Sequence, residues 1–332
     1  MIATKSAFKK IIPSSINYWN KYANLIIEKF SGESEIKEIE RLIDIIKLQR
    51  NKIDIIIGLG GGKVLDTAKS IASRADIKCG IIPTIAASDA PCIGASAIYD
   101  ENHCFQNLEF FNNPDFVFVD SQIIAEAPVR YLIAGIADGL STWFEAVSCE
   151  KSKAPNFTNS YRTDTGNFLA KLCFDNLLKY GKKAVDDCKA NRVTDALEHV
   201  IEANILLSGV GVENTGLASP HFIQFGLSQL ERTRAYLHGE EVAIGVLAGL
   251  FLNNTPDTLI DEIYSFCELL KLPTTLADIG LKNPTDKELT TVAETACNVG
   301  FPSCHEPFNI TPNDIINVLN KVDAYGRKRK GI

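Results

Sequence analysis

The stretch from residue 53 to residue 69, IDIIIGLGGGKVLDTAK, constrains the fold of this chain more than any other. An apolar run rich in β-branched residues ends at Gly58, three consecutive glycines occupy residues 60–62, and apolar residues then recur at helical spacing. This pattern predicts a strand, a tight turn and a helix. The turn would direct backbone N–H groups and the positive end of the helix at one point, which suits a phosphate. The alternative is that the turn binds no ligand. Its spacing matches neither G-x-G-x-x-G nor the P-loop motif, so the spacing does not itself identify a phosphate site.

The composition narrows the class of protein. The chain has 332 residues, enough for two domains of roughly 100–200 residues each. A net charge of −7 argues against nucleic acid or an anionic membrane as a partner. The nine cysteines are odd in number and form no C-x-x-C motif, which predicts reduced thiols in a cytoplasmic protein without a signal peptide. No run approaches the roughly 18 apolar residues of a membrane span.

Strand and helix patterns alternate in the first part of the chain and give way to helices in the second. Apolar strands separated by helices predict a parallel sheet covered on both faces. We therefore expect an α/β domain at residues 1–127 and an all-α domain at residues 128–332. Gly181 is expected to end a helix and Thr194 to cap one. Expected strands are 24–30, 54–57, 78–83 and 116–120, with none in 1–22; expected helices are 34–49, 63–74, 129–149, 160–190, 194–209, 239–253 and 255–270.

Two histidines suggest a metal site. His221 and His238 each lie at the edge of a helical segment beside small residues, which would leave room for a ligand. Histidines on adjacent helices commonly hold a transition metal together with a carboxylate. Asp138 is the best candidate for that carboxylate, because an ionised Asp inside an apolar helix is costly unless it is paired or metal-bound. Alternatively the histidines are ordinary helix-end residues and Asp138 pairs with an arginine. We expect His103 and His305 to lie on the surface.

Small and hydroxylated residues follow the expected strand 78–83. In open α/β sheets, ligands bind beyond the carboxyl ends of the strands. Thr84, Ser88 and Asp89 would lie there, close to the Gly-rich turn. Alternatively this segment is a plain loop with an Asx turn at Asp89.

Six stretches in order carry a family resemblance: GLGGGKVLDTAKS, IIPTIAASDAPC, NNPDFVFVD, YLIAGIADGLSTWFEA, VIEANILLSGVGVENTGLASPH and YLHGEEVAIG. Together they resemble the glycerol dehydrogenase family, within the metal-dependent group-III (iron-containing) alcohol dehydrogenases. The resemblance implies an N-terminal dinucleotide-binding domain, a C-terminal helical domain and an active site in the cleft between them. It also implies roles for individual residues: Asp138, His221 and His238 as ligands of Zn²⁺, with Fe²⁺ as the alternative; Asp89 as the contact to a polyol substrate; Gly61, Gly62, Lys63 and Asp66 as the pyrophosphate loop; Thr84 and Tyr99 as further NAD contacts.

The implied reaction is NAD-dependent oxidation of glycerol or a related vicinal diol to the hydroxyketone. A substrate hydroxyl bound to the metal would lose its proton, and its carbon would pass hydride to NAD. Asp89 would hold a neighbouring hydroxyl and so favour vicinal diols. The resemblance further implies a homo-oligomer, octamers included.

Three departures from the family pattern bear on this interpretation. Gln224 and Phe225 replace a His and an Asn that usually follow His221, and Ile93 replaces a usual Ser. The Gly-rich turn also comes earlier than is usual, so we expect the first strands to be missing, a sheet edge to be unpaired and NAD binding to be weak. Alternatives are a non-catalytic homologue that keeps the fold and metal, and a dehydrogenase for another small hydroxy compound. A lyase of the dehydroquinate synthase type is disfavoured by the motif around Asp89.

Overall fold

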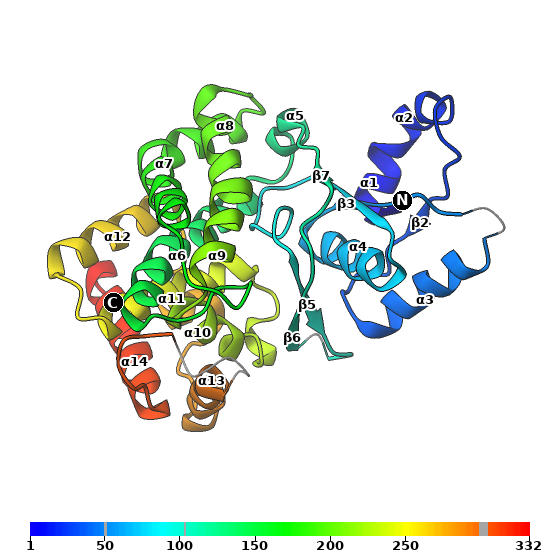
Figure 1. The fold of residues 1–332 in the computed structure, drawn as a ribbon. Coiled ribbons are helices and arrows are strands. Elements are labelled where there is room, and N and C mark those ends of the chain that lie inside the picture. Colours follow the sequence, from blue (N-terminus) through cyan, green and yellow to red (C-terminus); the bar gives the residue numbers. More distant parts are fainter. Residues whose placement is uncertain (50–51, 103, 299–304) are drawn as a thin grey trace. The chain divides into compact units, whose positions relative to one another are not determined.

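A computed structural model describes residues 1–49, 52–102, 104–298 and 305–332, which form two compact units (Figure 1). The α/β unit comprises residues 1–86 and 90–127. The helical unit comprises residues 87–89 and 128–332, and all its regular elements among the described residues are helices. The predicted fold class, a parallel α/β part followed by a helical part, is confirmed.

Five parallel strands form the sheet of the α/β unit, in the order β2-β1-β3-β4-β7. β3 (Ile55–Gly60) and β4 (Lys78–Pro83) pair along their whole length, from Ile55 opposite Lys78 to Gly60 opposite Pro83. Their apolar, β-branched sequences favour this central position. The other three strands have two residues each: β1 (Ile2–Ala3), β2 (Glu28–Lys29) and β7 (Phe116–Val117).

The prediction that residues 1–22 hold no strand is wrong. Ile2 of β1 is paired with Gly58 of β3 on one side and with Glu28 of β2 on the other. β3 is therefore not the edge of the sheet, and the edge position belongs to β2. A strand of two residues is too short to give an alternating sequence pattern, which is why the pattern of the first residues did not indicate it.

Helices cover both faces of the sheet, as predicted (Figure 1). Ile56 and Ile81 pack with the apolar side chains of two helices on one face. Leu59 and Ile82, which alternate with them along the strands, pack with two shorter helices on the other face. The first pair is α3 (Ile36–Lys47) and α4 (Gly62–Ala75), which are the helices expected at 34–49 and 63–74; the second pair is α1 (Lys5–Lys10) and α2 (Ile12–Trp19).

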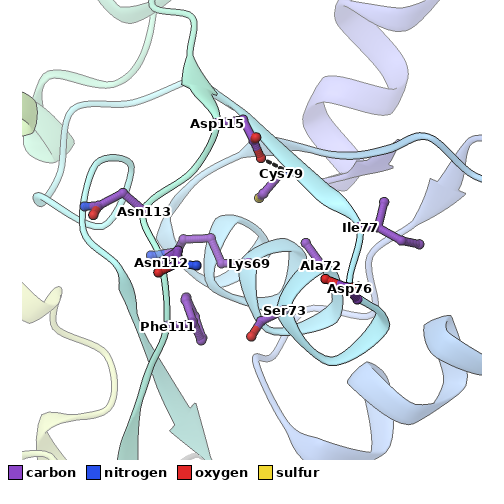
Figure 2. A pocket seen from close by; sticks show the side chains of 10 residues that line it. All are labelled: Lys69, Ala72, Ser73, Asp76, Ile77, Cys79, Phe111, Asn112, Asn113 and Asp115. Carbon is purple, nitrogen blue, oxygen red and sulfur yellow. Dashed lines mark hydrogen bonds between the residues drawn. The ribbon is translucent and has the colours of Figure 1, made fainter.

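An antiparallel hairpin that the sequence did not predict completes the unit, together with one short helix. Its strands are β5 (Ala95–Tyr99) and β6 (Phe105–Phe110), and the helix is α5 (Ser121–Ala125). A cavity of about 230 Å³ lies between the second half of α4 and residues 111–115, lined by Lys69, Asp76, Cys79 and Asp115 among others (Figure 2). None of its lining residues is a predicted cofactor contact.

The helical unit contains the long helices expected from the sequence. α7 runs past Gly181, whose Cβ position lies 3.1 Å from Cζ of Phe266, so the expectation of a helix end there is wrong. Thr194 caps the next helix through a hydrogen bond from the Leu197 N–H, as predicted. The helices are α6 (Val129–Ser152), α7 (Asp164–Lys189), α8 (Asp195–Glu202), α9 (Ser208–Thr215), α10 (Ser219–Leu227), α11 (His238–Leu252), α12 (Asp257–Leu270), α13 (Asp286–Asn298) and α14 (Pro312–Lys330).

The helix expected at residues 194–209 is interrupted by a π-helical turn, Ala203–Leu207, that joins α8 to α9. Asn204 in this turn is fully buried, and its Nδ2 donates to the carbonyl of Leu132 on α6 at 3.3 Å. π-Turns often occur at functional sites, and Ser208 directly follows this one. Among the described residues, no helix has both the length and the apolar character needed to span a bilayer.

Candidate metal centre

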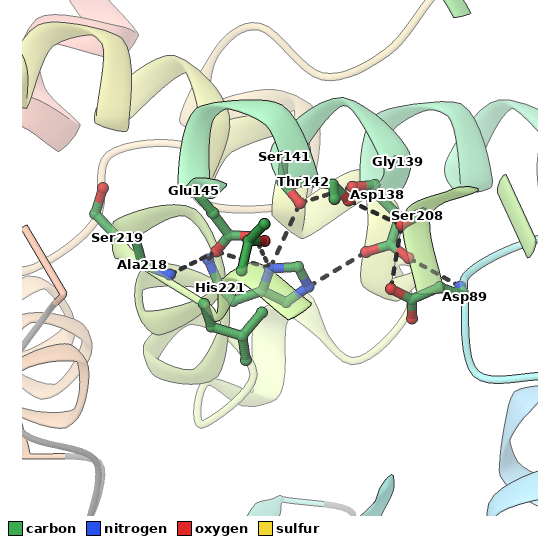
Figure 3. Close-up of polar contacts among 12 residues, drawn as sticks. Asp89, Asp138, Gly139, Ser141, Thr142, Glu145, Ser208, Ala218, Ser219 and His221 are labelled. Carbon is green, nitrogen blue, oxygen red and sulfur yellow. Dashed lines mark hydrogen bonds and ion pairs between the residues drawn. The ribbon is translucent and has the colours of Figure 1, made fainter. Parts of the chain in front are cut away.

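Asp138 lies on α6 and is almost completely buried, with 1% of its surface exposed (Figure 3). Its Oδ2 accepts a hydrogen bond from the Asp89 N–H at 3.3 Å. Its Oδ1 accepts none from the described residues, although Nε2 of His221 and Nε2 of His238 lie 3.3 and 3.2 Å away. A buried carboxylate oxygen without a hydrogen bond is costly. Two imidazole nitrogens and one carboxylate oxygen thus converge on one point.

His221 lies in the first turn of α10, where three contacts fix its ring. Both oxygens of Glu145 accept from Nδ1, at 2.9 and 3.0 Å, and Ser141 Oγ lies 3.5 Å from the same nitrogen. Glu145 comes from α6, the helix that also carries Asp138, and is fully buried. With Nδ1 engaged on one side, Nε2 faces Asp138 on the other.

His238 is the first residue of α11, and glycines bring this helix close to its neighbours. A Cβ at Gly239 would lie 1.9 Å from the carbonyl oxygen of Ala134, one turn before Asp138 on α6. A Cβ at Gly245 would lie 2.1 Å from the carbonyl oxygen of Pro220, which precedes His221 on α10. The small residues beside the histidines therefore let three helices approach one another. The expectation that small residues beside the histidines leave room for a ligand stays a prediction.

The charges of the three groups are strongly coupled. Burial raises the pKa of Asp138, but His238 and His221 outweigh this and hold that pKa below its usual range. Burial lowers the pKa of His221, but Glu145 and Asp138 reverse the effect and raise it well above its usual value. Both shifts have one physical cause, which is the attraction between the imidazoles and the carboxylates packed around them.

The donor set fits a divalent transition metal. One ligand atom from each of Asp138, His221 and His238 lies within 4.8 Å of the other two. Two imidazole nitrogens and a carboxylate oxygen suit Zn²⁺ or Fe²⁺, and three protein ligands leave a coordination position open. A cation would also satisfy the Asp138 oxygen that has no hydrogen bond.

Asp89 lies against the same cluster. Ser208 Oγ, which follows the π-turn, donates to Asp89 Oδ2 at 3.1 Å, and Thr142 Oγ1 lies 2.8 Å from Ser208 Oγ. Burial, followed by the neighbouring Asp138 carboxylate, raises the pKa of Asp89. The structure thus places the predicted substrate contact beside the predicted metal ligands, within the helical unit.

The Gly-rich turn forms the N-terminus of α4, as predicted. Gly60 has φ +151°, and a Cβ there would lie 2.3 Å from Thr4 Cγ2, so only glycine fits this position. Gly61 is the N-cap and Gly62 the first residue of α4, with no side chain capping the helix. The Thr84 N–H donates to the Gly60 carbonyl at 2.8 Å, so Thr84 lies beside the turn.

Three further predicted cofactor contacts lie on or beside α4. Lys63 Nζ lies 2.5 and 2.6 Å from the two oxygens of Glu33, and 5.2 Å from the centre of the Tyr99 ring. Asp66 makes contacts within the α/β unit instead. Its carboxylate is 2.9 Å from Lys69 Nζ and accepts from the Ala97 N–H at 3.3 Å. Asp66 therefore ties α4 to β5, whereas Lys63 and Tyr99 lie near the turn.

Comparisons with known proteins settle the family. Residues 1–121 match the family model of the iron-containing alcohol dehydrogenases. The chain is 46% identical to a glycerol dehydrogenase from Thermotoga maritima, over 95% of this chain and 87% of that protein. The chain belongs to the glycerol dehydrogenase family. A glycolaldehyde reductase from Halobacterium salinarum is 41% identical, over 90% of this chain and 82% of that protein.

A solved structure agrees with this family assignment. A probable glycerol dehydrogenase from Sinorhizobium meliloti superimposes with a TM-score of 0.93 at 37% identity, covering 98% of this chain and 90% of that one. The two-part fold that the family resemblance implied is therefore confirmed. The loss of family strands before the Gly-rich turn stays a prediction.

The structure adds to or corrects the sequence analysis at two polar residues. Glu145 was not a candidate, although it follows Asp138 by seven residues on α6 and so lies on the same helical face. That spacing was the available signal. His305 is buried, and its Nδ1 donates to the Leu217 carbonyl at 2.7 Å, so its predicted surface position is wrong. His103 lies outside the described residues.

Proposed function

We propose that this protein oxidises glycerol, or a related vicinal diol, to the hydroxyketone and transfers the hydride to NAD. Family membership supports the proposal, since a relative with 46% identity is a glycerol dehydrogenase. The observation that carries it is the buried Asp138 oxygen flanked by Nε2 of His221 and Nε2 of His238. This donor set would be a costly arrangement without a cation.

In this proposal Asp138, His221 and His238 hold Zn²⁺, with Fe²⁺ as the alternative. When bound there, the metal supplies Lewis acidity that lowers the pKa of a substrate hydroxyl. The three side chains fix its position, because each comes from a different helix packed against the others. Burial of Asp138 and His221 limits the access of water to the ligand atoms.

Asp89 would hold the second hydroxyl of the diol. Its carboxylate is already oriented by Ser208, and its backbone N–H is held by Asp138. A cation beside Asp138 would offset the negative charge that raises the pKa of Asp89, and so favour the ionised form that accepts hydrogen bonds. A substrate with vicinal hydroxyls would gain this contact, and a simple alcohol would not.

NAD would bind through its pyrophosphate at the N-terminus of α4. Gly61 and Gly62 present backbone N–H groups there, and Lys63 adds a positive charge. Thr84 and Tyr99 would complete the contacts, and Asp66 would hold α4 in place through β5. Residues 1–127 would then form the NAD-binding domain and residues 128–332 the metal-binding domain.

An NAD⁺ reduction assay tests this function. Protein stripped with a chelator would be assayed with glycerol, 1,2-propanediol and a 2-hydroxy acid, before and after addition of Zn²⁺ or Fe²⁺. We expect metal-dependent NADH formation with the two diols and little with the hydroxy acid. Folded, metal-loaded protein that forms no NADH with any diol would contradict the proposal and favour a non-catalytic homologue.

Reduction of a small hydroxyaldehyde is a second candidate. It is favoured by the 41% identity to a glycolaldehyde reductase. The same site would serve, since the metal would polarise the carbonyl oxygen and Asp89 would hold the neighbouring hydroxyl. NADH oxidation with glycolaldehyde, compared with NAD⁺ reduction with glycerol in one preparation, decides between the two substrates.

We also propose a homo-oligomer, octamers included, that works in the cytoplasm. The eight cysteines among the described residues form no disulfide, which suits a reducing compartment. Size-exclusion chromatography with light scattering measures the assembly directly, and a monomer would contradict this part of the proposal.

A further inference from the structure

We propose that Glu145 is the residue that positions His221 for metal binding: it holds the imidazole through Nδ1, so that Nε2 is the nitrogen offered to the metal. The inference rests on the metal site proposed above. It adds a positioning residue to that site. It also explains why the packing of α10 against α6 matters for metal binding.

The spacing of two carboxylates on α6 makes this possible. Asp138 and Glu145 are seven residues apart, which is two helical turns, so both project from one face of α6. The His221 ring lies between them, with Nε2 3.3 Å from Asp138 and Nδ1 2.9 Å from Glu145 (Figure 3). α6 therefore supplies both Asp138, one of the proposed metal ligands, and Glu145, which holds the second ligand, His221.

Glu145 also caps the helix that carries His221. α10 begins after Ala218, which has no side-chain hydrogen bond to offer as an N-cap. Glu145 Oε1 replaces that cap, accepting from the Ala218 N–H at 3.0 Å and from the His221 N–H at 3.2 Å. Backbone and ring of His221 are thus held by one buried carboxylate, which leaves the ring little freedom to turn.

The contact selects a tautomer. A carboxylate accepts hydrogen bonds, so the two Glu145 oxygens near Nδ1 require a proton on that nitrogen. The neutral ring then has its lone pair on Nε2, on the Asp138 side. A carboxylate behind a metal-bound histidine fixes the ring and raises its basicity, and loss of such a partner typically costs about 10–100-fold in metal affinity.

A second buried glutamate provides a matched control. Glu306 Oε1 accepts from the N–H of Ser219 at 3.2 Å and from its hydroxyl at 2.6 Å, and Oε2 accepts from Asn253. Glu306 therefore also caps the start of α10, but no contact joins it to the His221 ring among the described residues. Comparing the two glutamates separates helix capping from orientation of the histidine.

The test is the Zn²⁺ dissociation constant of the full chain, measured by competition with a chromophoric chelator, for wild type, Glu145→Gln and Glu306→Gln. In Glu145→Gln the amide oxygen can still cap α10, but the negative charge behind the His221 ring is lost and an NH₂ group replaces the oxygen 2.9 Å from Nδ1. We expect Glu145→Gln to weaken Zn²⁺ binding about 10–100-fold and Glu306→Gln to stay within about threefold of wild type. The Co²⁺ absorption spectrum should shift in Glu145→Gln alone.

Each other outcome overturns the inference. Wild-type affinity in Glu145→Gln would show that His221 needs no partner, and equal losses in both variants would assign the effect to helix capping. A wild type that binds neither Zn²⁺ nor Fe²⁺ would refute the proposed function and this inference with it. Should Glu145→Gln not fold, Glu145→Asp retains the charge but withdraws the oxygens by one methylene. Weaker Zn²⁺ binding in that variant than in a matched Glu306→Asp variant supports the inference, and equal binding in the two variants refutes it.

Discussion

Gly239 of α11 lies against the carbonyl of Ala134 on α6, so closely that a Cβ at Gly239 would be 1.9 Å from that oxygen. Gly239 follows the candidate ligand His238, and Ala134 lies one helical turn before the candidate ligand Asp138. The contact between the two helices therefore lies beside both candidate ligands. No side chain larger than hydrogen fits without separating the two helices. The distance between His238 and Asp138 is therefore set by this glycine.

Gly239→Ala should consequently damage the metal site more than the fold. The added methyl must displace the start of α11, which moves His238 away from Asp138. We expect Zn²⁺ affinity to fall at least about tenfold and the free energy of unfolding by about 1–3 kcal/mol. Chelator competition and urea unfolding measure the two effects.

Gly249→Ala on the same helix is the control for that substitution. Its Cβ would lie 3.1 Å from the Ser219 hydroxyl, a side-chain atom that can shift. We expect Zn²⁺ affinity close to wild type and a change in stability below about 1 kcal/mol, since alanine also favours the helix. Equal losses of affinity in both variants would contradict the role assigned to Gly239.

Asp89→Asn should change the choice of substrate. A hydrogen bond to a charged group contributes about 1.5–3 kcal/mol, so kcat/KM for glycerol should fall about 10–100-fold. Oxidation of 1-propanol, which has no second hydroxyl, should change less. Zn²⁺ affinity should stay within a few-fold, because Asp138 is bonded to the backbone N–H of Asp89 and not to its side chain. An equal loss of kcat/KM for glycerol and 1-propanol would mean that Asp89 does not bind the second hydroxyl.

Lys63 should matter for NAD and little for stability. Its ion pair with Glu33 is partly exposed, and such pairs contribute about 0–1 kcal/mol. We expect Lys63→Ala to weaken NADH binding about tenfold, measured by NADH fluorescence, without a matching change in the unfolding midpoint.

Two variants serve as controls for this prediction. Glu33→Gln removes the ion-pair partner of Lys63 and should not weaken NADH binding. Lys37→Ala, which removes another exposed Lys–Glu pair, should have no effect; a loss there equal to that of Lys63→Ala would contradict the assignment.

The sequence was most informative where the determinants are local. The apolar run and glycines around β3 and α4 specify strand, turn and helix within one segment, and the structure follows them closely. Asp138 was conspicuous for the same reason, as one acidic residue in an apolar helix. β1 is a strand only because β3 and β2 flank it, and no local pattern of two residues encodes that.

The residues that support the site could be identified only from tertiary packing, as was the case for β1. Glu145 acts on His221 only because α10 approaches α6, and nothing near residue 145 in sequence indicates which helix will be there. Gly239 was noticed as a small residue, but its neighbour Ala134 is more than a hundred positions away. The candidate ligands were thus predictable from motifs, whereas the contacts that hold them needed the structure.

Glu241 should give the metal-free protein a distinctive pH dependence. It is buried next to Gln224, one of the residues that departs from the family motif, and Gln224 Nε2 donates to it at 2.7 Å. Burial raises the pKa of Glu241 from 4.5 to about 7, although the Gln224 hydrogen bond opposes the shift. Between these values the folded chain keeps a proton that the unfolded chain releases. The free energy of unfolding must therefore fall as pH rises through this window, by up to about 3 kcal/mol.

Glu241→Gln removes this titration and keeps an amide oxygen for Gln224. Urea unfolding with a chelator present, at pH 5 and at pH 8, should show a larger loss of stability in wild type than in the variant. His221 also loses stabilisation as pH rises through its raised pKa, but it does so in both proteins. The difference between them therefore isolates Glu241. Equal losses, or a wild type that gains stability relative to the variant at pH 8, would show that Glu241 is ionised throughout the range.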